Sequence, residues 1–119
     1  IVRGCGGREI LSDALVKAGA RVNYAQCYLR DRPTINPERM LSVNEFAPQV
    51  VILQSGETLV NFDHLLSHQA WCDKQRTILV LPSARVAEQA KILGYQALLT
   101  SGSASNQAMC DTLVQKIQK

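Results

Sequence analysis

The chain alternates between two patterns of apolar residues. Short, mostly apolar stretches such as residues 49–53 and 77–81 have the length and composition of buried strands. Between them lie stretches such as residues 83–93, in which apolar residues recur every three or four positions, as on one face of a helix. Because a strand that is apolar on both sides needs cover on both sides, the alternation predicts an α/β fold: a parallel sheet with helices on both faces.

Residues 36–118 contain the clearest part of this pattern. Asn36 and Pro37 form a typical helix start, an N-cap followed by proline at the first helical position, and this helix is expected to end near Phe46. The strands expected after it are residues 49–53, 77–81 and 97–100, and the expected helices are residues 57–67, 83–93 and 105–118. One helix thus follows each strand, which is the order that a parallel sheet requires.

The first thirty residues predict a smaller strand–helix–strand unit. A glycine-rich turn over residues 3–9 follows Ile1 and Val2, and a helix then extends to Gly19, which is placed to end it. The strand expected next begins at residue 21, and its pattern continues to residue 30. The extended segment over residues 24–33 is long for such a sheet, so it is either one long strand or a strand that runs on into a connector toward a second domain. The sequence begins without methionine and inside an expected strand, so we expect a piece of a longer protein. The apolar positions of the helix are Ile10, Leu11, Ala14, Leu15 and Ala18.

Composition limits the class of protein. At 119 residues, with 46% hydrophobic and 19% charged residues, the chain has the size of one domain and enough apolar residues for a core. The net charge is +3, and the thirteen Lys and Arg residues are scattered along the sequence. This distribution disfavours a nucleic-acid interface and suits a small anionic ligand. No apolar run approaches the ~20 residues that a membrane-spanning helix needs.

The four cysteines, Cys5, Cys27, Cys72 and Cys110, are widely spaced and include no C-x-x-C pair. This spacing disfavours a zinc site and a disulfide scaffold, and it favours reduced thiols that pack as small apolar side chains. We therefore expect a cytoplasmic protein.

Four turns that follow expected strands are built mainly from small and polar residues, at positions 3–7, 54–56, 82–83 and 101–105. In an open parallel sheet such turns gather at the carboxyl ends of the strands, where ligands bind. Exposed amide and hydroxyl groups at helix N-termini attract anions. The sequence therefore predicts a polar rim suited to an acidic ligand. Ordinary helix capping by Ser and Gly is the alternative interpretation for each turn taken singly.

The sequence lacks the motifs of several other kinds of functional site. The first turn does not have the G-x-G-x-x-G spacing of dinucleotide-binding proteins, and neither a P-loop nor a G-x-S-x-G nucleophile motif is present. His64 and His68 are four residues apart on one expected helix, but no third metal ligand accompanies them. We interpret them as exposed side chains, and we expect no metal.

Several stretches of the sequence match one known family in order. The first turn reads R-G-C-G-G-R-E from Arg3 to Glu9, and a C-Y-L-R stretch ends at Arg30. Weaker matches lie at residues 19–22, 50–59, 78–94 and 101–113. Together these stretches resemble the C-terminal half of bacterial uroporphyrinogen-III synthase. Gln54 departs from the family pattern, which usually has Thr at that position.

The resemblance implies a lyase of haem biosynthesis that uses no cofactor. Such an enzyme closes hydroxymethylbilane, a linear tetrapyrrole with eight carboxylates, to uroporphyrinogen III, with inversion of ring D and loss of water. The resemblance implies that Tyr28 is catalytic and donates a hydrogen bond to the departing hydroxyl; a tyrosine that only packs against the connector is the alternative. The substrate-binding residues that it implies are Arg3, Gly4, Gly6, Gly7, Ser55, Gly56 and Ser83.

The resemblance also implies two similar flavodoxin-like lobes joined by an extended ladder. Residues 1–24 would belong to one lobe, residues 25–34 to the ladder, and residues 35–119 to the other lobe. Because both lobes would be incomplete, we expect a homodimer whose copies exchange residues 1–22; the alternative is a single compact fold in which residues 1–22 dock on their own chain. We expect the isolated piece to be inactive. The alternative function is a non-catalytic, flavodoxin-like or receiver-like binding module. Arg3 and Gln54 stand where a receiver domain needs acidic residues, which weakens that alternative.

Overall fold

The computed structural model describes residues 1–4, 9–28 and 31–118, and for residues 3, 4, 27 and 28 it describes the backbone alone. The chain forms two compact units, Ile1–Pro33 and Thr34–Lys119. None of the helices in the described ranges is long and apolar enough to cross a membrane.

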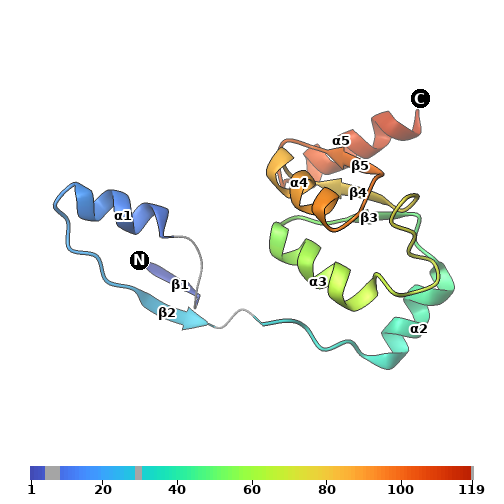
Figure 1. Ribbon diagram of the computed structural model, residues 1–119, viewed down its shortest axis with the longest axis horizontal. Coiled ribbons are helices and arrows are strands. Elements are labelled where there is room, and N and C mark those ends of the chain that lie inside the picture. The colour runs from blue at the N-terminus through green and yellow to red at the C-terminus, as the bar shows by residue number, and fades with distance from the viewer. Residues whose placement is uncertain (5–8, 29–30, 119) are drawn as a thin grey trace. The chain divides into compact units, whose positions relative to one another are not determined.

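The first unit is the strand–helix–strand unit that the sequence predicts (Figure 1). It consists of β1 (Val2–Gly4), α1 (Ile10–Lys17) and β2 (Ala25–Tyr28), and β1 pairs in parallel with β2. Gly19 ends the helix region with a φ of +89°, which glycine adopts without strain. No residue of α1 is buried, so the apolar face of this helix is exposed within the unit.

The second strand of this unit is shorter than predicted. The expected strand began at residue 21, but β2 begins at Ala25. The register explains the difference, because Val2 of the three-residue strand β1 already pairs with Ala25. No residue of β1 is left to pair with residues 21–24. The carbonyl of Asn23 instead accepts a hydrogen bond of 2.7 Å from the terminal amino group of Ile1. Residues 29 and 30 of the prediction lie outside the described residues.

The second unit confirms the predicted helices and strands. Asn36 caps the first helix, since its side-chain oxygen accepts from the backbone N–H of Glu38 at 2.8 Å. The elements are α2 (Pro37–Phe46), β3 (Val50–Ile52), α3 (Gly56–Leu66), β4 (Ile78–Leu81), α4 (Ala84–Ile92), β5 (Leu98–Thr100) and α5 (Asn106–Ile117).

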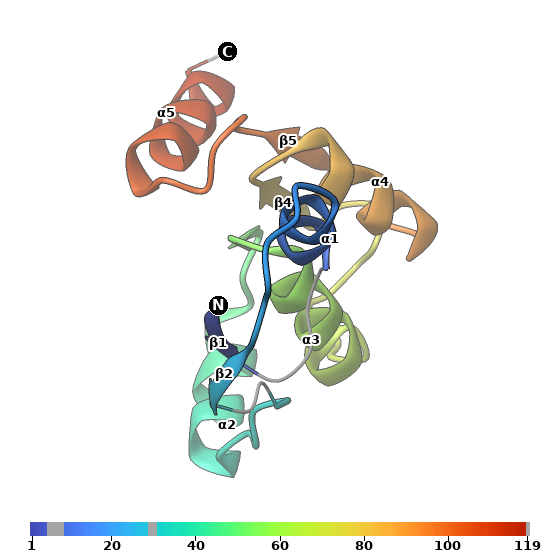
Figure 2. The same ribbon diagram turned by 90° about the vertical axis from the view of Figure 1, so that its left-hand side faces the viewer.

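The three strands of the second unit form a parallel sheet in the order β3-β4-β5. Helices α3 and α4 pack against each other on one face of the sheet, and α5 contacts β4 and β5 from the other face. Figure 2 shows α5 on one side of these strands and α3 and α4 on the other. The α/β fold with helices on both faces is therefore confirmed.

The core of this unit lies between the sheet and the α3–α4 pair. Its buried residues come from β4, the residue that follows β3, both of these helices and the segment between α4 and β5; they are Leu53, Leu59, Phe62, Leu79, Leu81, Val86, Ala87, Ala90 and Tyr95. On the opposite face Val80 and Met109 are buried. The sheet is thus covered on both faces at β4, and its carboxyl ends are held in a fixed arrangement.

Candidate functional site at the carboxyl ends of the strands

Three serines begin the helices at the carboxyl ends of β3, β4 and β5. Each hydroxyl oxygen accepts a hydrogen bond from a first-turn amide: Ser55 from Thr58 at 3.0 Å, Ser83 from Val86 at 3.3 Å, and Ser105 from Ala108 at 3.2 Å. The hydroxyl oxygens of Ser55 and Ser83 therefore act as helix caps, as the alternative interpretation of these turns expected. In each helix, the backbone N–H groups that come before the capped N–H have no carbonyl of their own helix to donate to. These N–H groups lie at the rim of the sheet.

Gln54 connects two of these turns across the middle strand. Its side-chain amide donates to the carbonyl of Ala104 at 3.2 Å and to the side-chain oxygen of Asn106 at 2.8 Å. The turn after β3 is thereby attached to the turn after β5, with β4 between them. Asn106 was not among the predicted site residues, because the contact joins positions 52 residues apart and leaves no local pattern. Two of the four predicted turns are thus joined by hydrogen bonds.

Gly56 lies directly beneath a side chain from the neighbouring helix. A Cβ atom at this position would lie 2.6 Å from the side-chain oxygen of Gln89 in α4. That oxygen is buried and has no hydrogen-bond donor among the described residues. Gly56 therefore has a packing role beside its predicted substrate-binding role, and the Gln89 oxygen is a local cost to stability.

We expect Gln89→Met to raise the free energy of unfolding of the Thr34–Lys119 unit by about 1 kcal/mol, because methionine has a similar shape and carries no acceptor to bury unpaired. Urea unfolding followed by the fluorescence of Trp71, the single tryptophan, measures the change. Glu88→Met, at an exposed neighbouring position, is the matched control and should shift stability by less than about 0.5 kcal/mol. A destabilised Gln89→Met variant would show that the oxygen has a partner.

The remaining predicted site residues belong to the first unit. Arg3 and Gly4 lie on β1, and Tyr28 is the last residue of β2, where it pairs with Gly4. Gly4 and Tyr28 are therefore together at the carboxyl ends of this two-stranded sheet. Gly6 and Gly7 lie outside the described residues. The structure brings Ser55, Gly56 and Ser83 to one rim, and Gly4 and Tyr28 to another.

The histidine pair shows no sign of a metal site in the part of the chain that the structure describes. His64 and His68 are both exposed. Among the described residues there is no group of three or more His, Cys, Asp and Glu side chains close enough to hold an ion.

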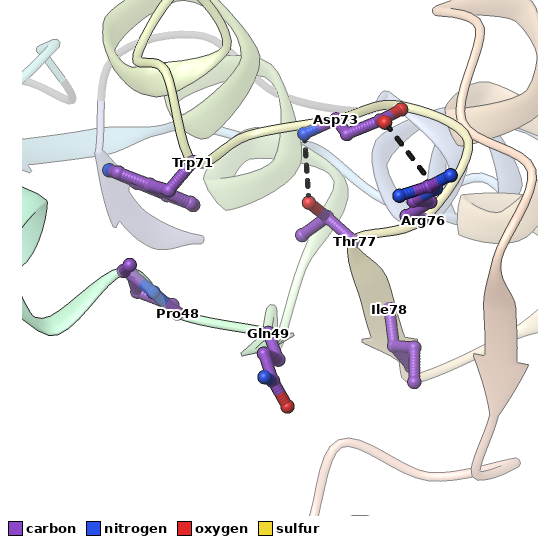
Figure 3. A pocket seen from close by; sticks show the side chains of 8 residues that line it. Pro48, Gln49, Trp71, Asp73, Arg76, Thr77 and Ile78 are labelled. Atoms are coloured by element: carbon purple, nitrogen blue, oxygen red, sulfur yellow. Dashed lines mark hydrogen bonds and ion pairs between the residues drawn. The ribbon is translucent and has the colours of Figure 1, made fainter.

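A cavity of about 500 Å³ lies at the opposite edge of the sheet, at the amino ends of β3 and β4 (Figure 3). Trp71, Pro48 and Ile78 give it apolar walls, and the Arg76 guanidinium lies 4.0 Å from the Asp73 carboxylate. The sequence patterns did not predict this cavity, because its walls come from two loops of irregular structure. No predicted site residue lines this cavity, and among its lining side chains only Arg76 is a cation, loosely paired with Asp73. We therefore place the functional site at the carboxyl edge of the sheet.

Three polar side chains form a partly buried cluster away from the rim. The hydroxyl of Tyr95 donates to the carboxylate of Asp63 at 2.9 Å, and the Lys74 ammonium lies 3.1 Å from the same oxygen. Lys74 also donates to the carbonyl of Leu93 at 2.6 Å. Burial first, and then the hydrogen bond to Asp63, raise the pKa of Tyr95 well above its ordinary value. Burial likewise raises the pKa of the nearby Cys72 thiol, so this cluster holds the unit together and supplies no nucleophile.

The raised pKa of Tyr95 predicts a loss of stability in alkali. The contribution of this group is fully present below a pH of about 10, where the unfolded phenol is also protonated. Above that pH the unfolded state releases its proton while the folded state keeps it, so stability falls as pH rises. Urea unfolding at pH 8 to 11 measures the effect, and Tyr95→Phe should show a smaller decline than the unchanged chain. Equal declines would contradict the assignment.

Comparison with known proteins supplies the family. The sequence model described as uroporphyrinogen-III synthase HemD matches residues 1–111. The chain belongs to the uroporphyrinogen-III synthase family. Membership confirms the resemblance drawn from the R-G-C-G-G-R-E and C-Y-L-R stretches, and it favours the synthase family over the alternative of a receiver-like binding module.

Two curated relatives bear the same name. The uroporphyrinogen-III synthases of Escherichia coli K12 and Salmonella typhimurium LT2 are 31% and 30% identical to the chain over 117 residues. Each alignment covers 95% of this chain and 47% of the relative. The chain therefore spans about half the length of the curated relatives it matches.

Proposed function

We propose that the chain is the part of a uroporphyrinogen-III synthase that binds the carboxylates of the tetrapyrrole and assists the loss of water. The observation that carries the proposal is the family match over residues 1–111, together with three capped helix N-termini along one edge of the second unit. The reaction closes hydroxymethylbilane to uroporphyrinogen III with inversion of ring D. We place it in the cytoplasm, on the cysteine pattern described above.

The rim is chemically suited to a ligand with many carboxylates. Backbone amides at the N-termini of α3, α4 and α5 can each donate to a carboxylate oxygen, and the positive ends of the helix dipoles favour the anion. Gln54 holds two of the three N-termini at a fixed separation through Asn106 and Ala104. Ser55, Gly56 and Ser83 then bind substrate through the amides of their turns, while the two serine hydroxyls serve as caps.

Tyr28 is the group proposed to act at the reacting carbon. A phenol with an ordinary pKa near 10 is protonated at neutral pH and can donate a hydrogen bond to the departing hydroxyl. Gly4 is paired with Tyr28 in the register. Gly4, together with Arg3 of β1 and Gly6 and Gly7 of the turn after β1, is proposed to bind carboxylates. The pyrroles supply the electrons that expel the hydroxyl, so the protein acts mainly by positioning.

A chimera tests the proposed activity. The matched 117-residue segment of the Escherichia coli synthase is replaced by this chain, and the purified chimera is supplied with hydroxymethylbilane. Formation of uroporphyrinogen III, followed by chromatography of the oxidised products, is the expected result. A chimera that is folded by circular dichroism and thermal unfolding, yet makes no uroporphyrinogen III, would contradict the proposal.

In that chimera, Tyr28→Phe should lower kcat by about tenfold, since a lost hydrogen bond to a leaving group with developing charge is worth about 1.4 kcal/mol or more. The value of KM should change little, because the phenol acts on the departing hydroxyl rather than on a carboxylate. Tyr24→Phe, four residues earlier, is the control and should leave kcat unchanged. Equal effects of the two variants would assign Tyr28 a packing role.

For the isolated chain, we propose a homodimer in which each copy lends its first unit to the second unit of its mate. The support is that each unit leaves apolar surface exposed: Ile10 and Leu11 on α1, and Ile52 on β3. We expect this dimer to have little or no turnover. Multi-angle light scattering at micromolar concentration should give twice the monomer mass, and a monomer mass would contradict the dimer.

A further inference from the structure

Arg85 lies in the first turn of α4 without a charged partner. It is the second residue of that helix, after the N-cap Ser83 and the first helical residue Ala84. Its side chain is exposed, and no carboxylate among the described residues forms an ion pair with it. The first turns of α3, α4 and α5 contain no other lysine or arginine. The cation that these turns bring to the carboxyl edge is therefore unpaired.

A cation at this position is unfavourable for the helix itself. The N-terminus of a helix carries a positive partial charge, so acidic side chains stabilise the first turn and basic side chains destabilise it. Helix α3 follows this rule with Glu57, whereas the first turn of α4 has no acidic residue and contains Arg85. Residues that break such a local rule are expected mainly where function retains them. The position of Arg85 is explained if an anion binds beside it.

Gln89, one turn further along α4, shows which way Arg85 faces. The side-chain oxygen of Gln89 would lie 2.6 Å from a Cβ atom at Gly56, the first residue of α3, and the two helices pack side by side (Figure 1). Residues four apart on a helix share a face, with Cβ atoms about 5–6 Å apart, and their side chains lean toward the helix N-terminus. Arg85 thus lies toward α3, one turn nearer the carboxyl edge than Gln89.

The side chain of Gln89 carries a second free donor at this place. Its oxygen is buried against Gly56 and has no donor among the described residues. Its amide nitrogen is neither buried nor bonded to an acceptor in the part of the chain that the structure describes. An amide turned this way costs stability, but it leaves its two N–H groups available to a ligand. Two side chains on one face of α4 thus carry unused donors beside the N-terminus of α3.

We infer that Arg85, with the side-chain amide of Gln89, binds one carboxylate of the tetrapyrrole beside the N-terminus of α3. A guanidinium binds a carboxylate through two parallel hydrogen bonds, and the amide N–H groups of Gln89 supply a further donor. The positive end of the α3 dipole favours the same anion. The inference rests on the proposed function. It adds two side chains to a rim at which the other proposed donors of the second unit are backbone amides.

Binding of uroporphyrinogen III to the isolated chain tests Arg85, with isothermal titration calorimetry under reducing conditions as the measurement. Arg85→Gln should raise Kd about tenfold or more, because charge-assisted hydrogen bonds are lost. Arg85→Lys keeps the charge without the planar fork and should give an intermediate Kd. Arg76→Gln removes the same charge at the opposite edge of the sheet and should raise Kd less than about twofold. Equal Kd values for Arg85→Gln and Arg76→Gln would overturn the inference.

Thermal unfolding of the same variants separates binding from folding. Arg85→Gln should leave Tm unchanged or slightly raised, because the cation opposes the helix dipole. Gln89→Met should be more stable than the unchanged chain and yet bind uroporphyrinogen III about fivefold more weakly, because methionine lacks the donor. A lowered Tm for Arg85→Gln would assign Arg85 to the fold and overturn its binding role. A Gln89→Met variant that binds as tightly as the unchanged chain would overturn the part assigned to Gln89.

Failure of the proposed function gives a different result from failure of this inference. An unchanged chain that does not bind uroporphyrinogen III would contradict both. An unchanged chain that binds it, with equal binding by Arg85→Gln, would contradict the inference alone. In the chimera, Arg85→Gln should raise KM about tenfold with kcat nearly unchanged, because the carboxylate is held equally in the ground state and the transition state. A lowered kcat with unchanged KM would overturn this role of Arg85.

Discussion

Replacing Leu59 by alanine should lower the free energy of unfolding of the Thr34–Lys119 unit by about 3 kcal/mol. Leu59 is fully buried in the core formed by α3, α4 and the sheet. Its removal would leave a cavity among large side chains such as Phe62 and Leu81, which the sheet and two helices hold in place. A loss of this size is a large fraction of the stability of a typical domain, about 5–15 kcal/mol.

Val60→Ala is the matched control for this substitution. Val60 is the next residue of the same helix and is 49% exposed, so its truncation removes little buried area and should cost less than about 1 kcal/mol. Urea unfolding monitored by Trp71 fluorescence measures both variants. Similar costs for Leu59→Ala and Val60→Ala would mean that α3 does not pack on the sheet by the face assigned here.

Asp63→Ala should destabilise the same unit by about 2 kcal/mol, because it leaves the buried hydroxyl of Tyr95 without its acceptor. Tyr95 is fully buried, and its hydroxyl donates to Asp63 at 2.9 Å. The substitution also removes the carboxylate that lies 3.1 Å from the Lys74 ammonium, and this partly exposed ion pair adds little. The hydroxyl of Tyr95 is therefore the main source of the loss.

Two comparisons identify that source. Glu88→Ala breaks an exposed ion pair with Lys91 and should cost less than about 0.5 kcal/mol. Adding Tyr95→Phe to Asp63→Ala should recover part of the lost stability, since the unpaired hydroxyl is removed with little change of shape. If the double variant were less stable than Asp63→Ala alone, the hydroxyl would have a partner other than Asp63.

The sequence was sufficient for the elements and the class of fold because the signals were local. Asn36 followed by Pro37 marked the start of α2, and the apolar stretches marked β3 and β4 within one or two residues. The extent of β2 was wrong because strand length depends on a partner. Residues 21–24 alternate like a strand, but β1 offers them nothing to pair with.

The candidate site was predictable in position and not in its internal contacts. Ser55 and Ser83 were placed correctly at the carboxyl edge, since a parallel sheet brings those ends together. The hydrogen bond from Gln54 to Asn106 and the close approach of the Gln89 side chain to Gly56 join residues far apart in the sequence. Contacts of this kind depend on helix packing distances that no local pattern records.

The central claim is that the carboxyl edge of the second unit binds the carboxylates of a tetrapyrrole. The most direct measurement is a nuclear magnetic resonance titration of the isotopically labelled chain with uroporphyrinogen III under reducing conditions. We expect saturable shifts of the backbone amides of Gly56, Ala84 and Asn106, at the N-termini of α3, α4 and α5. The indole N–H of Trp71, at the cavity on the opposite edge, should stay unshifted. Shifts at Trp71 without shifts at those three amides, or no shifts at all, would contradict carboxylate binding at the carboxyl edge.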